Sequence, residues 1–147
     1  MNLFCVEIES RLFFSPVIDD WETLEAQGIS VVIDLEGGLD HGCPTLPNHM
    51  LYVYFPIYDE DLPDLPKLHA VARLGADLVR SGHRVLCHCG MGFNRSALMA
   101  GLILVHLGAC PGEEAVFVLR RCRPGALFNQ VFAAYLAALS GGVLPSR

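Results

Sequence analysis

The stretch HCGMGFNRS, residues 88–96, brings together a thiol, two glycines and an arginine. A glycine-containing loop between a strand and a helix can turn several backbone N–H groups inward, and the positive N-terminal end of the following helix adds to them. Arg95 can bind two phosphate oxygens with its planar guanidinium. The same positive field favours the thiolate, nucleophilic form of Cys89. The loop therefore predicts covalent phosphoryl transfer through a cysteinyl-phosphate.

Phosphoryl transfer from an ester also needs a proton donor for the leaving oxygen. Residues 55–64, FPIYDEDLPD, follow an apolar run and carry four candidate acids: Asp59, Glu60, Asp61 and Asp64. These carboxylates can reach the end of the sheet at which the thiol loop lies. Asp61 and Asp64 are equally readable as solvated loop charges, and Asp64 as a helix cap.

Alternating strands and helices are predicted around this loop. Apolar runs predict strands at residues 11–16, 29–35, 51–57 and 84–88, the last three of them buried on both faces. Helical spacing and cap residues predict helices at residues 21–28, 66–82, 95–108, 113–122 and around 128–139. We therefore expect an α/β fold in one domain, residues 1–147, with a mostly parallel sheet of four to five strands flanked by helices. Ligands of such sheets bind beyond the carboxyl ends of the strands, where residues 88–96 fall.

Composition limits the classes of partner. A hydrophobic share of 52% predicts a globular chain, and a net charge of −6 argues against a nucleic-acid-binding protein. The first ten residues lack the features of a secretory signal, and the apolar run at residues 97–109 is shorter than the ~20 residues that span a bilayer. We expect a cytoplasmic protein with no membrane insertion. Its six cysteines are then expected to be free thiols: Cys5, Cys43, Cys87, Cys89, Cys110 and Cys122.

The motifs resemble those of a known superfamily. His88-Cys89, five further residues and Arg95-Ser96 resemble the signature of the cysteine-dependent protein tyrosine phosphatases, and their context resembles the small dual-specificity phosphatases. Pro56-Ile57-Tyr58-Asp59 matches the Pro-x-x-Asp placement of that family's general acid. Arg123-Pro124-Gly125-Ala126, with Asn129, resembles its closing Arg-Pro segment. The resemblance covers nearly the whole chain and implies a dual-specificity phosphatase-like fold.

The resemblance also implies roles. Cys89 is the nucleophile, and Arg95 binds phosphate and stabilises the transition state. Asp59 is the acid and then the base for water. Ser96 assists release of the phosphoenzyme, and His88 helps to hold the thiolate and the loop. Backbone groups of the remaining loop residues bind phosphate: Gly90, Met91, Gly92, Phe93 and Asn94, beside Arg95. The scheme needs no metal or cofactor, and the expected partner of this monomeric enzyme is a phosphorylated protein or peptide.

Three other functions remain possible at this stage. A phosphoinositide or inositol phosphate phosphatase is disfavoured because the loop has no lysine to hold extra ring phosphates. A non-catalytic phospho-residue binding module would not need both Cys89 and Asp59. A sulfur-transfer enzyme would leave the Asp59 segment and the Arg-Pro segment unexplained.

Several neighbouring residues have less specific interpretations. Residues 36–49 form either a surface loop or a border of the active cleft. The three arginines of residues 120–123 are expected to complement the carbonyls at a helix end, rather than to form a basic patch. Cys87 is expected to pack in the core, although it could quench an oxidised Cys89. A zinc site built from residues 83–89 is disfavoured, since adjacent strand residues point to opposite faces.

Overall fold

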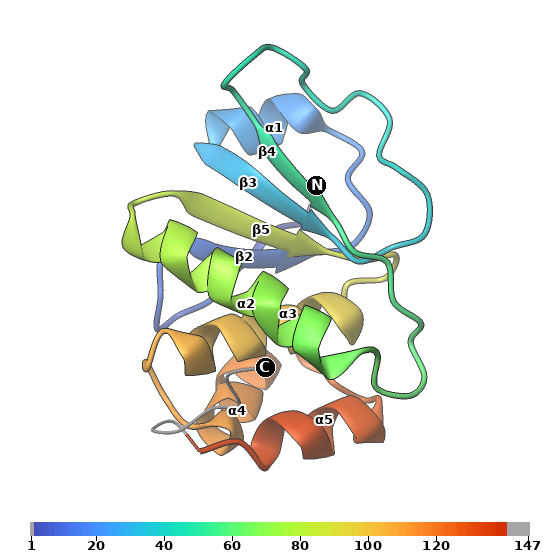
Figure 1. The fold of residues 1–147 in the computed structure, drawn as a ribbon, viewed down its shortest axis with the longest axis vertical. Coiled ribbons are helices and arrows are strands. Elements are labelled where there is room, and N and C mark those ends of the chain that lie inside the picture. The colour runs from blue at the N-terminus through green and yellow to red at the C-terminus, as the bar shows by residue number, and fades with distance from the viewer. Residues whose placement is uncertain (1, 141–147) are drawn as a thin grey trace.

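The computed structural model describes residues 2–140, and its centre is a five-stranded sheet (Figure 1). The strands are β1 (Phe4–Cys5), β2 (Leu12–Ser15), β3 (Ile29–Asp34), β4 (Leu51–Tyr54) and β5 (Arg84–His88). They lie in the order β1-β2-β5-β3-β4, and β1 alone pairs in the antiparallel direction. The predicted α/β fold with a mostly parallel sheet is confirmed.

Helices cover both faces of the sheet. They are α1 (Trp21–Ala26), α2 (Leu65–Arg80), α3 (Arg95–His106), α4 (Gly112–Cys122) and α5 (Gln130–Ala137). Helix α1 lies on one face, whereas α2 and α3 lie on the other, with α4 and α5 beyond them (Figure 1). The five predicted helices all form, with ends within a few residues of the expected ones. Asp20 and Asp64 cap α1 and α2, each accepting a backbone N–H with its side chain.

The pair β5 and α3 forms the rigid support of the thiol loop. Strand β5 lies between β2 and β3, and its residues from Val85 to His88 are buried. Helix α3 is buried from Ser96 to Val105, as its apolar composition predicts. Cys87 belongs to the main core between the sheet and α2 to α5, so it packs there as expected. The loop is therefore anchored at both ends in the best-packed part of the molecule.

Strand β4 corrects one prediction. The run at residues 51–57, which Pro56 was expected to end, was predicted to be a strand buried on both faces, but the strand, Leu51–Tyr54, forms the edge of the sheet. Leu51 and Tyr54 are 44% and 40% exposed. Pro56 has no N–H with which to continue a ladder, so the chain leaves the sheet there. Within residues 2–140, no helix is long and apolar enough to cross a membrane.

Candidate active site

The loop that follows β5 begins where three parallel strands end together. His88 pairs with Ser15 of β2 and with Asp34 of β3. The Cys89 N–H donates to the Ser15 carbonyl at 3.3 Å, and the His88 carbonyl accepts from the Leu35 N–H at 2.9 Å. We call residues 89–95 the phosphate loop. It lies at the carboxyl edge of the sheet, as predicted.

The thiol of Cys89 is held inside this loop. Its Sγ accepts the Gly92 N–H at 3.3 Å, and its S–H donates to the Ser96 Oγ at 3.3 Å. The side chain of Cys89 is nearly buried, at 2% exposure. One backbone N–H is thus aimed at the sulfur, and a hydroxyl oxygen lies within hydrogen-bonding distance of it.

Asn94 links the phosphate loop to the acidic segment. It occupies the N-cap position of α3, but its Nδ2–H donates to Asp59 Oδ2 at 2.9 Å. The other oxygen of Asp59 accepts from the Asn129 Nδ2–H at 2.8 Å. The Asn129 backbone N–H in turn donates to Asn94 Oδ1 at 2.9 Å. Of the four candidate acids, Asp59 is thus tied directly to the loop, whereas Asp64 caps α2.

Arg95 lies at the start of α3 and faces the carboxyl edge. Its Nη1 donates to Glu36 Oε1 at 3.1 Å and to the Ile57 carbonyl at 3.2 Å, and its Nη2 donates to Glu36 Oε2 at 3.4 Å. Its Nε is buried and has no hydrogen-bond partner within the described residues. A cavity of about 340 Å³ opens beside this guanidinium. Arg95 therefore has one N–H donor, at Nε, that no group in the described residues accepts.

Glu36 was not singled out from the sequence, and it places residues 36–49 at the border of the site. A Cβ atom on Gly90 would lie 2.1 Å from Glu36 Oε2, so only glycine allows the carboxylate and the loop to approach so closely. The signal that could have identified Glu36 is its position, because it lies two residues beyond the end of β3, at the same edge of the sheet as Arg95.

His88 faces a buried carboxylate pair. Its Nε2 lies 2.6 Å from Asp40 Oδ2 and 3.2 Å from Asp34 Oδ1. The Tyr52 hydroxyl donates to Asp34 and accepts the Asp40 N–H. Burial raises the pKa of Asp34. The ring thus joins β5 to residues 34–40, and no hydrogen bond in the described part of the chain joins it to Cys89.

The side chains of Asp34, Asp40 and His88 also form a group that could hold a metal ion, since their ligand atoms lie within 4.8 Å of one another. This group is not the zinc site of residues 83–89 that the sequence disfavours. His83 forms a hydrogen bond with Ser30, and Cys87 packs in the core.

Arg123 corrects a second prediction. It was expected to complement carbonyls at the end of its own helix, but its Nη1 donates to the Met91 and Gly92 carbonyls of the phosphate loop, at 2.6 and 2.8 Å. The reason is local: α4 ends at Cys122, and Arg123 has an extended backbone with φ −140° and ψ 105°. That conformation carries its side chain away from the helix end.

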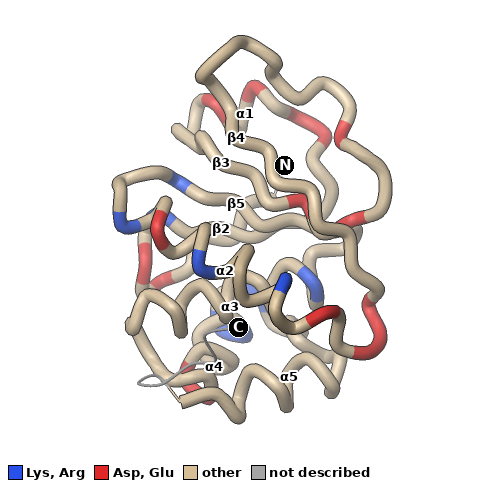
Figure 2. Tube along the Cα trace, viewed as in Figure 1, with Lys and Arg blue, Asp and Glu red and all other residues tan. Residues whose placement is uncertain are grey.

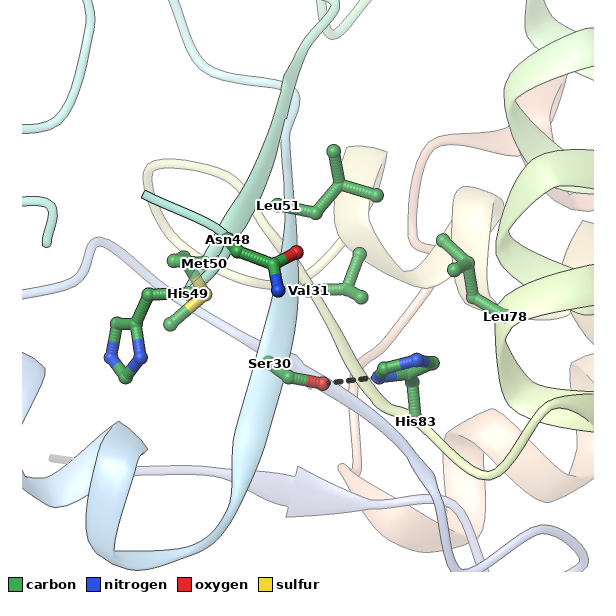
Figure 3. A pocket seen from close by; sticks show the side chains of 8 residues that line it. All are labelled: Ser30, Val31, Asn48, His49, Met50, Leu51, Leu78 and His83. Atoms are coloured by element: carbon green, nitrogen blue, oxygen red, sulfur yellow. Dashed lines mark hydrogen bonds between the residues drawn. The ribbon is translucent and has the colours of Figure 1, made fainter. Parts of the chain in front are cut away.

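A second cavity lies at the opposite end of the sheet (Figure 3). It measures about 310 Å³, and the Ser30 Oγ and His83 Nδ1 form a hydrogen bond at its wall. Its lining comes from the amino ends of β3 and β4 and the turn before β5. None of the site residues predicted from the sequence lines it.

Known structures resemble this chain over almost its whole length. Tk-PTP in its active form is 27% identical, with a TM-score of 0.75, and the match covers 97% of this chain and 100% of that chain. Human DUSP28 is 20% identical, with a TM-score of 0.75, and 92% of each chain is covered. A mouse putative dual specificity phosphatase complexed with zinc tungstate is 23% identical, with a TM-score of 0.74, and 88% of this chain and 82% of that chain are covered. The last two show the fold alone. None of the curated proteins compared with the chain matches it.

The family model and the fold place the chain among the small cysteine-dependent phosphatases of the dual-specificity type. Residues 9–109 match the family model Tc-R-P, described as a polymorphic toxin system DSP-PTPase phosphatase, and the chain belongs to this family. The inositide phosphatase and the non-catalytic binding module are not favoured by these findings.

Proposed function

We propose that this chain is an active phosphatase that hydrolyses phosphate monoesters on phosphorylated proteins or peptides. In the first step the Cys89 thiolate attacks phosphorus. The S–P bond forms, the P–O bond to the leaving group breaks, and Asp59 gives its proton to the departing oxygen. Arg95 and the loop N–H groups hold the equatorial oxygens while charge develops on them.

In the second step water attacks the cysteinyl-phosphate. Asp59, now a carboxylate, takes a proton from the water, the S–P bond breaks, and inorganic phosphate leaves. The Ser96 hydroxyl, 3.3 Å from the sulfur, donates to the thiolate as it is released. His88 supports the scheme through its bonds to Asp34 and Asp40, which fix the end of β5 from which the loop begins.

One observation carries this proposal: the hydrogen bond from Asn94 to Asp59 brings the candidate acid onto the loop of the candidate nucleophile. The backbone supplies further support, because the Gly92 N–H already points at the sulfur. Chains that merely bind phosphate have no need for an acid in this place.

The surroundings favour a substrate with a single phosphate. The phosphate loop contains no lysine, and acidic residues gather in the loops that follow β3 and β4 (Figure 2). Met91 and Tyr58 are 68% and 82% exposed and offer apolar contacts to a peptide. A polyanionic inositol phosphate meets repulsion from these acids, whereas a singly phosphorylated peptide meets less.

We further propose a monomeric enzyme of one domain that acts in the cytoplasm. All six cysteines are free in the structure, which suits a reducing compartment.

The test is Cys89→Ser, assayed on phosphotyrosine, phosphoserine and phosphothreonine peptides with a metal chelator present. Turnover is lost because the hydroxyl of serine is not ionised at neutral pH and is a weak nucleophile, while vanadate still binds because the backbone and Arg95 remain. Residual turnover near that of the unmodified protein would rule out the covalent route. A wild-type chain that hydrolyses inositol phosphates in preference to every peptide would overturn the substrate class.

A further inference from the structure

Three consecutive carbonyl groups of the phosphate loop are hydrogen-bonded by one short segment late in the chain. The Arg123 Nη1 donates to Met91 O at 2.6 Å and to Gly92 O at 2.8 Å. The Leu127 N–H donates to Phe93 O at 2.8 Å. We call residues 123–127 the outer clamp, since these bonds reach the loop on its carbonyl side.

The outer clamp has a direct consequence for the inner side of the loop. In a trans peptide, the C=O of one residue and the N–H of the next point in opposite directions. Carbonyls held outward at positions 91, 92 and 93 therefore turn the N–H groups of Gly92, Phe93 and Asn94 inward. The Gly92 N–H shows this orientation, because it donates to Cys89 Sγ at 3.3 Å. A carbonyl that turned inward would present its negative end to a phosphate.

The guanidinium of Arg123 is fixed by packing as well as by these bonds. Its Cζ lies 3.6 Å from the centroid of the Phe93 ring and 4.7 Å from that of Phe4. A Cβ atom on Gly92 would lie 2.7 Å from Arg123 Nη1, and Gly92 has a φ of +73°. Glycine is thus required at position 92 by both its backbone and the close approach of the arginine. The planar group is pre-organised and loses little entropy in binding the loop.

Arg123 also adds charge near the sulfur. It takes part in no salt bridge within residues 2–140, so no carboxylate neutralises it there. Burial lowers the pKa of its guanidinium, and the charge of Cys89 opposes that shift, which means that the two groups lie within electrostatic reach. A positive charge behind the loop favours a thiolate and an oxyanion in front of it.

We propose that Arg123 is a positioning residue of the phosphate loop: by holding the Met91 and Gly92 carbonyls outward, it keeps the loop N–H groups directed at Cys89 and at a bound oxyanion. This inference rests on the proposed function, because it takes the phosphate loop to be the part of the protein that binds phosphate. Arg123 itself does not touch the substrate. Its effect reaches the reacting atoms through the backbone of the loop.

The experiment compares Arg123→Lys and Arg123→Met with the matched control Arg121→Met. Arg121 lies at the same end of α4, its side chain is 59% exposed, and it faces Glu7 at 3.5 Å, away from the loop. Three quantities are measured for each variant. They are the dissociation constant of orthovanadate, the midpoint pH of the alkylation of Cys89 by iodoacetamide, and the midpoint temperature of thermal unfolding. Mass spectrometry monitors the alkylation.

Both Arg123 variants should bind vanadate on the order of 10-fold or more weakly, the scale of lost hydrogen bonds to a charged group. The alkylation midpoint should rise most in Arg123→Met and less in Arg123→Lys, since lysine keeps the charge but lacks the planar fork. Arg121→Met should leave both quantities unchanged. A purely structural role for Arg123 would lower only the thermal midpoint.

A folded Arg123→Lys protein with unchanged vanadate binding and an unchanged midpoint would overturn the inference, as would an equal loss in Arg121→Met. If Arg123→Met does not fold, Arg123→Lys decides alone. These readouts need no turnover. If the wild-type chain hydrolyses no ester, but substitution of Arg123 weakens vanadate binding, the proposed function is contradicted and the positioning role of Arg123 is supported. If the Arg123 variants keep full turnover and unaltered vanadate binding, only the positioning role is contradicted.

Discussion

Asn129 and Asp59 are 70 residues apart in the sequence, and the Asn129 Nδ2–H donates to Asp59 Oδ1 at 2.8 Å. Asn94 binds the other oxygen at 2.9 Å, so the carboxylate has a donor on each side. This fixes its direction relative to the phosphate loop before a substrate arrives. Asp59 is the proposed acid and Asn129 directs it, so the two residues carry different predictions.

The first prediction concerns Asp59→Asn. Protonation of the leaving oxygen matters most for poor leaving groups, so hydrolysis of a phosphopeptide should fall roughly 10²–10⁴-fold, and that of an activated nitrophenyl phosphate by less. The alkaline limb of the pH–rate profile should flatten. The measurement is kcat/KM on both substrates across pH.

Asp61→Asn and Asp64→Asn are the controls for that prediction. The Asp64→Asn variant should keep its cap on α2, because asparagine is as good an N-cap as aspartate, and neither variant should depend on the leaving group. If Asp61→Asn shows the leaving-group dependence and Asp59→Asn does not, the acid is misassigned.

The second prediction concerns Asn129→Ser. Serine can still cap α5, where the Asn129 side chain accepts the Val131 and Phe132 N–H groups, but it cannot donate to Asp59 as the amide does. We expect kcat to fall about 10-fold, because a misdirected acid transfers its proton less well. Vanadate affinity should stay the same. A parallel loss of vanadate affinity would show instead that Asn129 supports the loop.

The third prediction concerns Arg95→Lys. An ammonium cannot reproduce a planar fork that binds Glu36 and Ile57 on one side and keeps Nε available on the other. The rate should fall on the order of 10²-fold or more, as for the loss of a preorganised donor. Steady-state kinetics with Arg121→Lys as the matched control measures this. Near-normal kcat would mean that the backbone alone carries the anion.

The fourth prediction is a pH dependence of stability that lies outside the site. His106 Nε2 and His69 Nδ1 lie 2.9 Å apart, and His69 Nε2 lies 2.5 Å from the Tyr135 hydroxyl. Burial lowers the pKa of His106 to about 4 and also lowers that of His69. The pKa of a histidine in the unfolded chain is ~6.5, so between pH 6.5 and pH 4 the unfolded chain binds more protons than the folded one. The free energy of unfolding should therefore fall as the pH drops through this window.

Thermal melts at pH 7.5 and pH 5 of the wild type and His106→Gln test that dependence. The variant should be less stable at pH 7.5, since a buried hydrogen bond is altered, but should lose less on acidification. Equal losses in the two proteins would mean that the carboxylates of the chain, rather than this histidine pair, set the acid response.

The phosphate loop could be predicted from the sequence because its information is local. The loop lies between a strand and a helix that are adjacent in the sequence, and it contains two glycines and an arginine. This order of residues is typical of an anion-binding loop. The edge position of β4 could not be predicted in this way, since an apolar run such as LYVYFPI suits an edge strand and a central strand alike. Strand β1 has two residues and is too short to give a periodic signal.

Glu36 and Arg123 could not be predicted for a different reason. The contacts of each depend on a distant part of the chain: Glu36 binds Arg95, and Arg123 binds the carbonyls of Met91 and Gly92. Arg123 also lies beyond residues 9–109, the part that the family model matches. The sequence showed that an Arg-Pro segment was present, but the direction of its side chain follows from the end of α4.

The position of the outer clamp has a consequence for how the protein is made. Synthesis proceeds from the N-terminus, so Asp59, Cys89 and Arg95 are joined to the chain before residues 123–129. A growing chain thus contains Cys89 throughout the translation of residues 90–122, before Arg123 is added, while the carbonyls of the surrounding loop still lack their donors. A chain arrested in that interval contains the Cys89 thiol but none of the donors that hold the carbonyl side of the loop, and the geometry of the loop is complete only when the turn after α4 closes onto it.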